Sequence, residues 1–125
     1  MSDSAVPADL LYTPSHEWIR QEGDVVTIGI TDHAQHELGD IVFVELPDVG
    51  QSVDTGMGFA VIEAVKTVAD VYCPTAGEVI EINEILATDA AAINRDAYGS
   101  WIAKIRLKGA LPTDLLDASG YKAIL

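Results

Sequence analysis

The chain has 125 residues, 49% of them apolar, and a formal net charge of −13 at pH 7. This length supports a single domain, residues 1–125, around one hydrophobic core, and it leaves no room for a second, catalytic domain. The excess of acidic residues disfavours binding to nucleic acid or to anionic membranes, and no apolar run approaches the roughly 18 residues of a membrane span.

The N-terminal segment predicts a polar lead followed by a first strand. Residues 1–9 are expected to be flexible, and they lack the basic region and apolar core of an export signal. The single cysteine, Cys73, cannot form a disulfide within the chain. These features predict a cytoplasmic protein.

After a turn at residues 21–24, residues 25–30 are rich in β-branched side chains and predict a strand.

A short helix and a further strand are expected next. Thr31 or Asp32 can cap a helix, because its side-chain oxygen can accept hydrogen bonds from the free amides of the first turn. This helix is expected to end at Gly39. Residues 41–46 predict a strand, which Pro47 ends.

Residues 59–72 predict a β-hairpin with a lysine at its tip. The segment is rich in β-branched and small apolar residues, has turn formers on both sides and carries Lys66 near its middle. Such a hairpin would hold an amine in solvent on a stiff support. An ordinary solvated turn lysine fits the same pattern, because exposed lysines are common.

Residues 77–82 repeat a short pattern found earlier in the chain. Like residues 39–44, they begin with a glycine and an acid and continue with four residues dominated by β-branched aliphatics. Two such strands, one before and one after the hairpin, indicate two similar halves packed as a sandwich.

The last third of the chain predicts two short helices and one strand. Residues 89–93 are rich in alanine and form a candidate helix with Asp89 as its cap. Residues 101–107 largely alternate between apolar and basic side chains, which predicts a half-buried strand with a basic outer face. Residues 112–125 are expected to form a peripheral C-terminal helix, broken at Gly120, on the outside of the sheets.

The surroundings of Lys66 resemble the attachment hairpin of the lipoyl and biotinyl carrier domains, in which one lysine at a hairpin tip is acylated. Glycines flank the hairpin, and acids lie near the lysine at Glu63 and Asp70. Biotin carriers usually place methionine on both sides of the lysine. Val65 and Thr67 occupy these positions here, which favours the lipoyl branch.

Several separate segments resemble one family, the glycine cleavage system H proteins. The likeness spans about residues 10–125 in the family's order. The segments that carry it are residues 12–19, 29–50, 63–66, 74–79 and 94–101, followed by the leucine-rich C-terminal tail. The resemblance implies an all-β fold of the lipoyl/biotinyl type, a flattened barrel-sandwich of two small sheets with short peripheral helices.

The resemblance also implies a function. Lys66 would carry lipoate in amide linkage, and the protein would be a carrier in glycine catabolism and one-carbon metabolism rather than an enzyme. Its partners would be a pyridoxal phosphate-dependent glycine decarboxylase, a tetrahydrofolate-dependent aminomethyltransferase, a flavin-containing dihydrolipoamide dehydrogenase and the lipoylating enzymes. The carrier would shuttle the aminomethyl group from the first enzyme to the second, and we expect it to be a monomer.

Three carboxylates are candidates for contact with the loaded arm, whose primary amine would be cationic. These are Glu17, Glu63 and Asp70. The alternative interpretation is that these acids are solvated or serve recognition by the lipoylating enzyme.

The sequence departs from the family's usual pattern at a few positions. Ala64 replaces a serine, Ala97 a proline and Cys73 a small residue without a thiol, and the turn before Trp101 is one residue shorter. Two alternatives to glycine cleavage therefore stay open. One is a lipoyl relay that donates its acyl group to other lipoyl domains, and the other is an unmodified partner-binding paralogue.

Other side chains with chemical potential are interpreted more simply. His33 and His36 could share a helical face, but no third ligand accompanies them, so we predict no metal site. Cys73 is expected to pack in the sheet rather than to exchange with a dithiolane. Trp18 and Trp101 are expected to be core residues rather than partner contacts.

Overall fold

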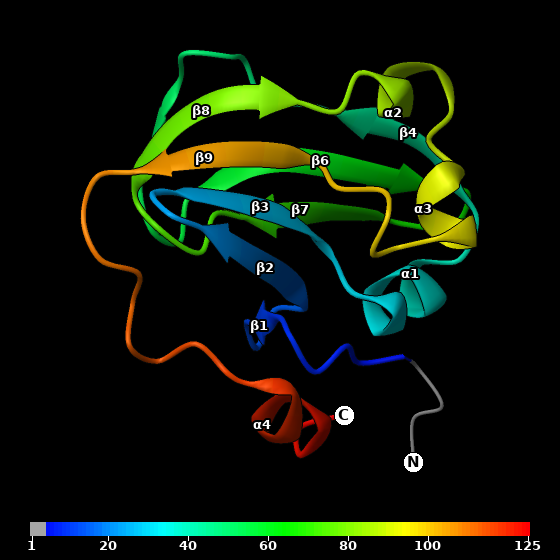
Figure 1. Ribbon diagram of the computed structural model, residues 1–125. Coiled ribbons are helices and arrows are strands. Elements are labelled where there is room, and N and C mark those ends of the chain that lie inside the picture. Colours follow the sequence, from blue (N-terminus) through cyan, green and yellow to red (C-terminus); the bar gives the residue numbers. More distant parts are fainter. Residues whose placement is uncertain (1–4) are drawn as a thin grey trace.

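Two antiparallel β-sheets packed face to face make up the body of the protein in the computed structural model, which describes residues 5–125 (Figure 1). The strands are β1 (Leu11–Tyr12), β2 (Glu17–Glu22), β3 (Val25–Ile30), β4 (Ile41–Glu45), β5 (Ser52–Val53), β6 (Gly58–Ala64), β7 (Val68–Tyr72), β8 (Gly77–Ile82) and β9 (Ala103–Leu107). The helices are α1 (Asp32–Leu38), α2 (Ile85–Thr88), α3 (Ala92–Arg95) and α4 (Ala118–Lys122). The larger sheet has the strand order β1-β2-β3-β9-β8-β5, and the smaller has the order β4-β6-β7. This arrangement confirms the predicted fold class.

Aliphatic side chains fill the space between the two sheets. Ile28 of β3 and Ile105 of β9 contribute to this core from the larger sheet, and Ile62 of β6 contributes from the smaller one. Each of these side chains is fully buried. Because full burial of one such side chain contributes about 1.5–3 kcal/mol, the core holds the central strands in place.

A smaller aromatic cluster lies on the other face of the larger sheet. Trp18 of β2 pairs with Gly29 of β3, and a Cβ added to this glycine would stand 2.6 Å from the indole. Trp18 is completely buried, which confirms that it is a core residue. Trp101 is only half-buried, and the Lys104 ammonium lies 5.0 Å from the centroid of its ring. The prediction of a core position therefore holds fully for Trp18 and only in part for Trp101.

The predicted helix after β3 is present as α1. The Thr31 side chain caps it by accepting a hydrogen bond from the Ala34 N–H at 3.2 Å, and Gly39 ends it with a φ of 77°. The strands β4 and β8, whose sequences share a pattern, lie one in each sheet.

The helix predicted over residues 89–93 is wrong in its position and in its cap. The chain instead forms α2 and α3, each a single turn, and neither has a side-chain cap. Asp89 lies between them and pairs with Arg95. The reason is burial, because Leu86 of α2 and Ile93 of α3 both contact the core and so decide where the turns form.

The break predicted at Gly120 is also wrong, and the C-terminal helix is shorter than predicted. Asp117 caps α4 by accepting a hydrogen bond from the Gly120 N–H at 2.8 Å, so the glycine lies inside the first turn. The tail is not merely peripheral. Tyr121 is completely buried, and its ring stacks on that of Tyr12 with centroids 4.6 Å apart.

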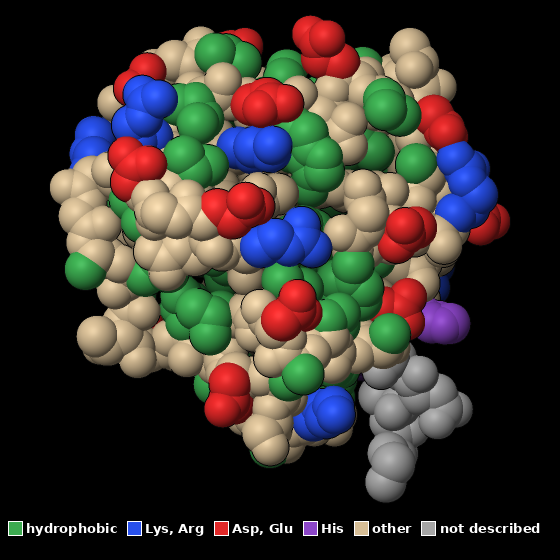
Figure 2. All heavy atoms as spheres, viewed as in Figure 1, with side chains coloured by type: hydrophobic (Ala, Val, Ile, Leu, Met, Phe, Trp, Pro, Cys, Tyr) green, Lys and Arg blue, Asp and Glu red, His purple; other side chains and the backbone are tan. Residues whose placement is uncertain are grey.

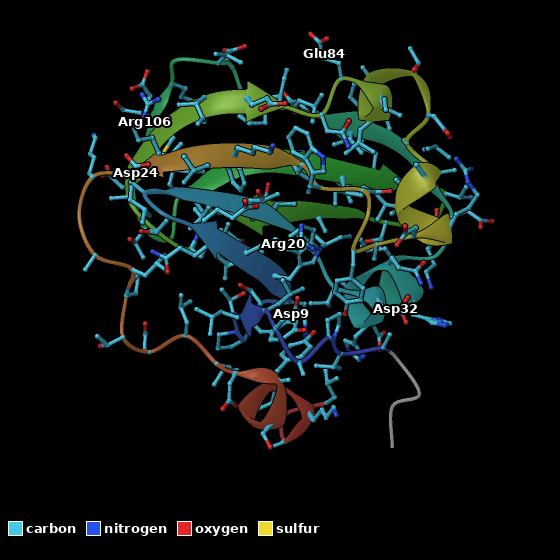
Figure 3. All side chains as sticks on the ribbon, viewed as in Figure 1. Asp9, Arg20, Asp24, Asp32, Glu84 and Arg106 are labelled. Carbon is cyan, nitrogen blue, oxygen red and sulfur yellow. The ribbon has the colours of Figure 1, made fainter. Side chains whose placement is uncertain are left out.

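The outer face of the larger sheet carries both charge types. Figure 2 shows Lys and Arg side chains lying among carboxylates on this face, and Figure 3 shows Arg20 and Arg106 extending from it. The Lys104 ammonium lies 3.6 Å from the Glu81 carboxylate. Carboxylates of the neighbouring strand thus partly offset the basic face that the alternating pattern predicts.

Part of the predicted flexible lead makes defined contacts. Residues 1–4 lie outside the described residues. The Ala5 N–H donates to the Asp32 carboxylate at 3.2 Å, and the Tyr98 hydroxyl donates to the Ala5 carbonyl. Within residues 5–125, no helix has the length and apolar character needed to cross a bilayer.

Candidate functional site

Lys66 lies at the tip of a hairpin formed by β6 and β7. The Ala64 N–H donates to the Thr67 carbonyl at 2.8 Å and closes this tip. Because β6 is the central strand of the smaller sheet, the hairpin stands on a framework that is paired on both sides. The Lys66 side chain is exposed, and no ion pair among residues 5–125 includes it. The arrangement presents a primary amine to a macromolecular partner.

The loop between α1 and β4 contacts the hairpin tip and helps to hold it in place. The Val65 N–H donates to the Asp40 carbonyl at 2.9 Å. The aliphatic part of Lys66 passes close to Gly39, where an added Cβ would stand 3.3 Å from the lysine Cε. The outer part of the lysine side chain, from Cδ to Nζ, therefore lies next to the backbone of Gly39.

Exposed apolar side chains surround the tip. Val65 is 75% exposed and Val68 is 62% exposed, and Val42 and Phe43 lie exposed on the neighbouring strand β4. A β-bulge lies between Ile41 and Phe43. It leaves two consecutive residues, Val42 and Phe43, both facing outward. Exposed apolar surface next to one free amine suits contact with another protein.

A cavity of about 160 Å³ lies alongside the hairpin, between α1, β7 and the start of β2. Its lining combines aliphatic residues with three acidic residues, the buried Glu17 and the exposed Glu37 and Asp70. Asp70 follows Lys66 by four residues, roughly 13 Å along an extended chain. A larger cavity of about 250 Å³, with a more polar lining, lies on the other side of Asp70 toward residues 45–48. The smaller cavity is the better candidate site, because its lining is the more apolar of the two and includes the buried Glu17.

Glu17 is held in a fixed position on the cavity wall. It is only 2% exposed, and its Oε1 accepts hydrogen bonds from Thr13 Oγ1 at 2.5 Å and from Ser15 Oγ at 2.7 Å. Both hydroxyls donate to the same oxygen, which fixes the orientation of the carboxylate. Of the three acids predicted from the sequence, Glu17 and Asp70 both line the cavity, Glu17 as a buried residue and Asp70 as an exposed one. Glu63 lies apart from it, on the outer face of the smaller sheet beside Phe43 and Val68.

Sequence reasoning missed several residues of this cavity. Glu37 of α1 lines the cavity three residues after Ala34, a spacing that could have identified it. Its side chain is 72% exposed, and its carboxylate lies 3.6 Å from His33 Nε2. His16 offers no such signal. It has a φ of 72°, and its Nδ1 lies 2.7 Å from the Tyr121 hydroxyl. Burial, together with the neighbouring His33, lowers the pKa of His16.

The thiol of Cys73 takes no part in this site. It is buried, and it donates a hydrogen bond to the Thr75 carbonyl at 3.0 Å. Burial raises its pKa to about 11. The packed position predicted from the sequence is confirmed. Within residues 5–125, no group of three or more His, Cys, Asp or Glu side chains is arranged to hold a metal ion.

Comparisons with known proteins agree with this geometry. The family model described as glycine cleavage H-protein matches residues 10–125. The glycine cleavage system H protein of Burkholderia cenocepacia is 54% identical over 125 residues, which cover 98% of each chain. That of Coxiella burnetii is 52% identical over 122 residues, which cover 95% of this chain and 94% of the relative. The crystal structure of a glycine cleavage system H protein from Mycobacterium marinum has a TM-score of 0.88 at 39% identity and covers 94% of this chain and 97% of that one. The chain therefore belongs to the glycine cleavage H-protein family.

Proposed function

We propose that this protein is the lipoyl carrier of a glycine cleavage system, with lipoate attached in amide linkage to Lys66. The observation that carries the proposal is the exposed lysine at the tip of a supported hairpin, with a carboxylate-lined cavity beside it. Membership of the family supports the same role. In this role the chain is not itself a catalyst but is handed from enzyme to enzyme.

The residues around Lys66 fit an acyl attachment. Its amine is exposed and belongs to no ion pair within the described part of the chain, so acylation removes a charge without leaving a partner unpaired. The attached lipoate would supply a disulfide that is reduced as it accepts the aminomethyl group. Attachment keeps that reactive group at high effective concentration for successive enzymes.

The cavity would hold the loaded arm between transfers. Glu17, Asp70 and Glu37 line the cavity and would give it negative charge where the arm's amine is cationic, and its aliphatic residues offer apolar contact to the arm. Electrostatic attraction is stronger next to the buried Glu17 than in bulk water. The fixed Glu17 would position the amine, because its orientation is already set by two hydroxyl groups.

The partners in this proposal are the pyridoxal phosphate-dependent glycine decarboxylase, the folate-dependent aminomethyltransferase, the flavin-containing dihydrolipoamide dehydrogenase and a lipoylating enzyme. The exposed apolar side chains at the tip offer contact area to them, and Glu63 adds a negative charge at the edge of this apolar surface. The net charge of −13 favours encounters with basic surfaces. A cytoplasmic location and a monomeric state are part of the proposal.

The decisive experiment compares Lys66→Arg with the native chain. Each is produced in cells with an active lipoylation pathway, and the intact mass is measured. We expect one lipoyl group on the native chain and none on Lys66→Arg, which should also fail in glycine-dependent one-carbon transfer with the partner enzymes. Lys122→Arg, at an exposed position of α4, is the matched control and should behave as the native chain.

Two outcomes would contradict the proposal. Retained one-carbon transfer by Lys66→Arg would exclude the lysine as the attachment point. A native chain that stays unmodified beside a modified control carrier would favour a partner-binding protein instead.

A further inference from the structure

Three hydrogen bonds converge on the side chain of Asn94, in α3. Its Nδ2 donates to the Gly39 carbonyl and to Gln35 Oε1, each at 2.9 Å, and its Oδ1 accepts from the Ile41 N–H at 2.9 Å. One half-buried amide thus joins the end of α1 to the beginning of β4, more than 50 positions earlier in the chain.

The loop that Asn94 holds is the loop that supports the hairpin tip. The carbonyl of its middle residue, Asp40, accepts the hydrogen bond from the Val65 N–H, and a Cβ added at Gly39 would stand 3.3 Å from Lys66 Cε. A continuous series of contacts therefore runs from Asn94 through residues 39–41 to residues 65 and 66. Figure 1 shows β6 ending on the side of the sandwich where α1 and α3 lie.

We propose that Asn94 is a positioning residue for the covalent modification of Lys66. It fixes the loop, and the loop fixes the backbone from which the lysine extends. This inference rests on the proposed function, because it concerns the enzyme that acylates the lysine. That enzyme must receive the amine in one geometry, and a loosened tip adopts this geometry only part of the time. The apparent affinity then falls in proportion to the competent fraction, so the defect belongs in KM rather than in kcat.

The test uses Asn94→Ala in the unmodified full-length chain, with a lipoate–protein ligase, lipoate and ATP as the probe. Asn83→Ala is the matched control, because Asn83 Nδ2 also bonds a distant backbone carbonyl, that of Trp101, at 2.9 Å. Exchange of the Val65 amide hydrogen, followed by NMR, reports directly on the tip. Circular dichroism confirms that both variants are folded.

For Asn94→Ala we expect KM to rise about fivefold to tenfold with kcat unchanged, and Val65 exchange to become about tenfold faster. Asn83→Ala should change neither. Gln35→Ala removes only one acceptor and should give a smaller rise in KM, so it replaces Asn94→Ala if that variant does not fold.

An Asn94→Ala chain with native KM and native Val65 exchange would overturn the inference and leave the proposed function intact. An equal rise in KM for Asn83→Ala would overturn it as well, because the effect would then be one of general stability. A native chain that the ligase does not acylate would overturn the proposed function itself, and with it the role of Asn94 in modification.

Discussion

At the level of single residues, burial separates the two side chains that could react as nucleophiles. Lys66 is exposed on a supported tip, whereas Cys73 is buried beneath the hairpin framework. A thiol with a raised pKa exists mainly in its neutral, unreactive form at physiological pH. We therefore do not expect the Cys73 thiol to exchange with the disulfide of an attached lipoyl arm.

The burial of Cys73 predicts how the stability of the folded chain depends on pH. Burial raises its pKa from 9.0 to about 11, so folding favours the neutral thiol. The resulting stability is complete below pH 9 and is lost as the pH rises through 11. We expect the free energy of unfolding of the native chain to fall over this range relative to that of Cys73→Ala, as measured by urea titration at several pH values.

Reaction with a thiol reagent provides an independent check. At pH 8 the folded chain should react at least about 100-fold more slowly than the urea-unfolded chain, because two pKa units reduce the thiolate fraction by that factor. Equal rates would show that the thiol is accessible in the folded state.

Among the elements, α4 is the one whose role the sequence least suggests. Its Tyr121 hydroxyl lies 2.7 Å from both His16 Nδ1 and Thr31 Oγ1. Thr31 caps α1, and His16 lines the cavity. The C-terminal segment therefore helps to fix the positions of α1 and of His16, and it does so from outside the cavity.

We predict that Tyr121→Phe lowers the free energy of unfolding by about 1–2 kcal/mol through the lost hydrogen bonds. Tyr121→Ala should lower it by about 3–5 kcal/mol, because it also removes a stacked aromatic ring. Lys122→Ala, exposed on the same helix, is the control and should change it by less than about 0.5 kcal/mol. A loss below 1 kcal/mol for Tyr121→Ala in urea unfolding would mean that α4 is not part of the folded core.

The elements also show where local sequence is sufficient. The hairpin and α1 were predictable, because β-branched runs, turn residues and the Thr31 cap act over a few neighbouring residues. The positions of α2 and α3 were not, because the burial of Leu86 and Ile93 against distant strands decides them. A sequence pattern does not contain that packing.

For the protein as a whole, negative charge is the dominant surface property. Only Arg20 and Lys66 are basic among the first 94 residues. The lysine is thus an isolated cation in an acidic stretch of the chain, and acylation would make that stretch more negative still. Partner enzymes with basic docking surfaces would be attracted over about a Debye length, roughly 8 Å at physiological salt.

This charge distribution predicts a salt-dependent role for Glu63. At low salt, Glu63→Gln should raise the KM of lipoylation about twofold to fivefold, and the effect should shrink at about 0.15 M salt. Glu22→Gln is the matched control, because Glu22 is exposed at the β2–β3 turn, at the other end of the sandwich (Figure 1). Equal effects of the two substitutions would indicate that net charge matters and that position does not.

The candidate site itself was only partly predictable. Lys66, Glu17 and Asp70 could be proposed through the family resemblance, but nothing in the sequence places Glu17 and Asp70 in one cavity. That cavity exists because β2, α1 and β7 pack together, and such long-range contacts have no local signature.

The backbone of Gly39 also limits how far this protein can vary. Its φ of 77° and ψ of −151° belong to a region that essentially only glycine occupies. Gly23, with a φ of 65° and open space around it, differs, because asparagine or aspartate can adopt that conformation. At position 39 any side chain would both strain the end of α1 and press on the lysine stem. Random mutagenesis should therefore accept substitutions at position 23 and return only glycine at position 39.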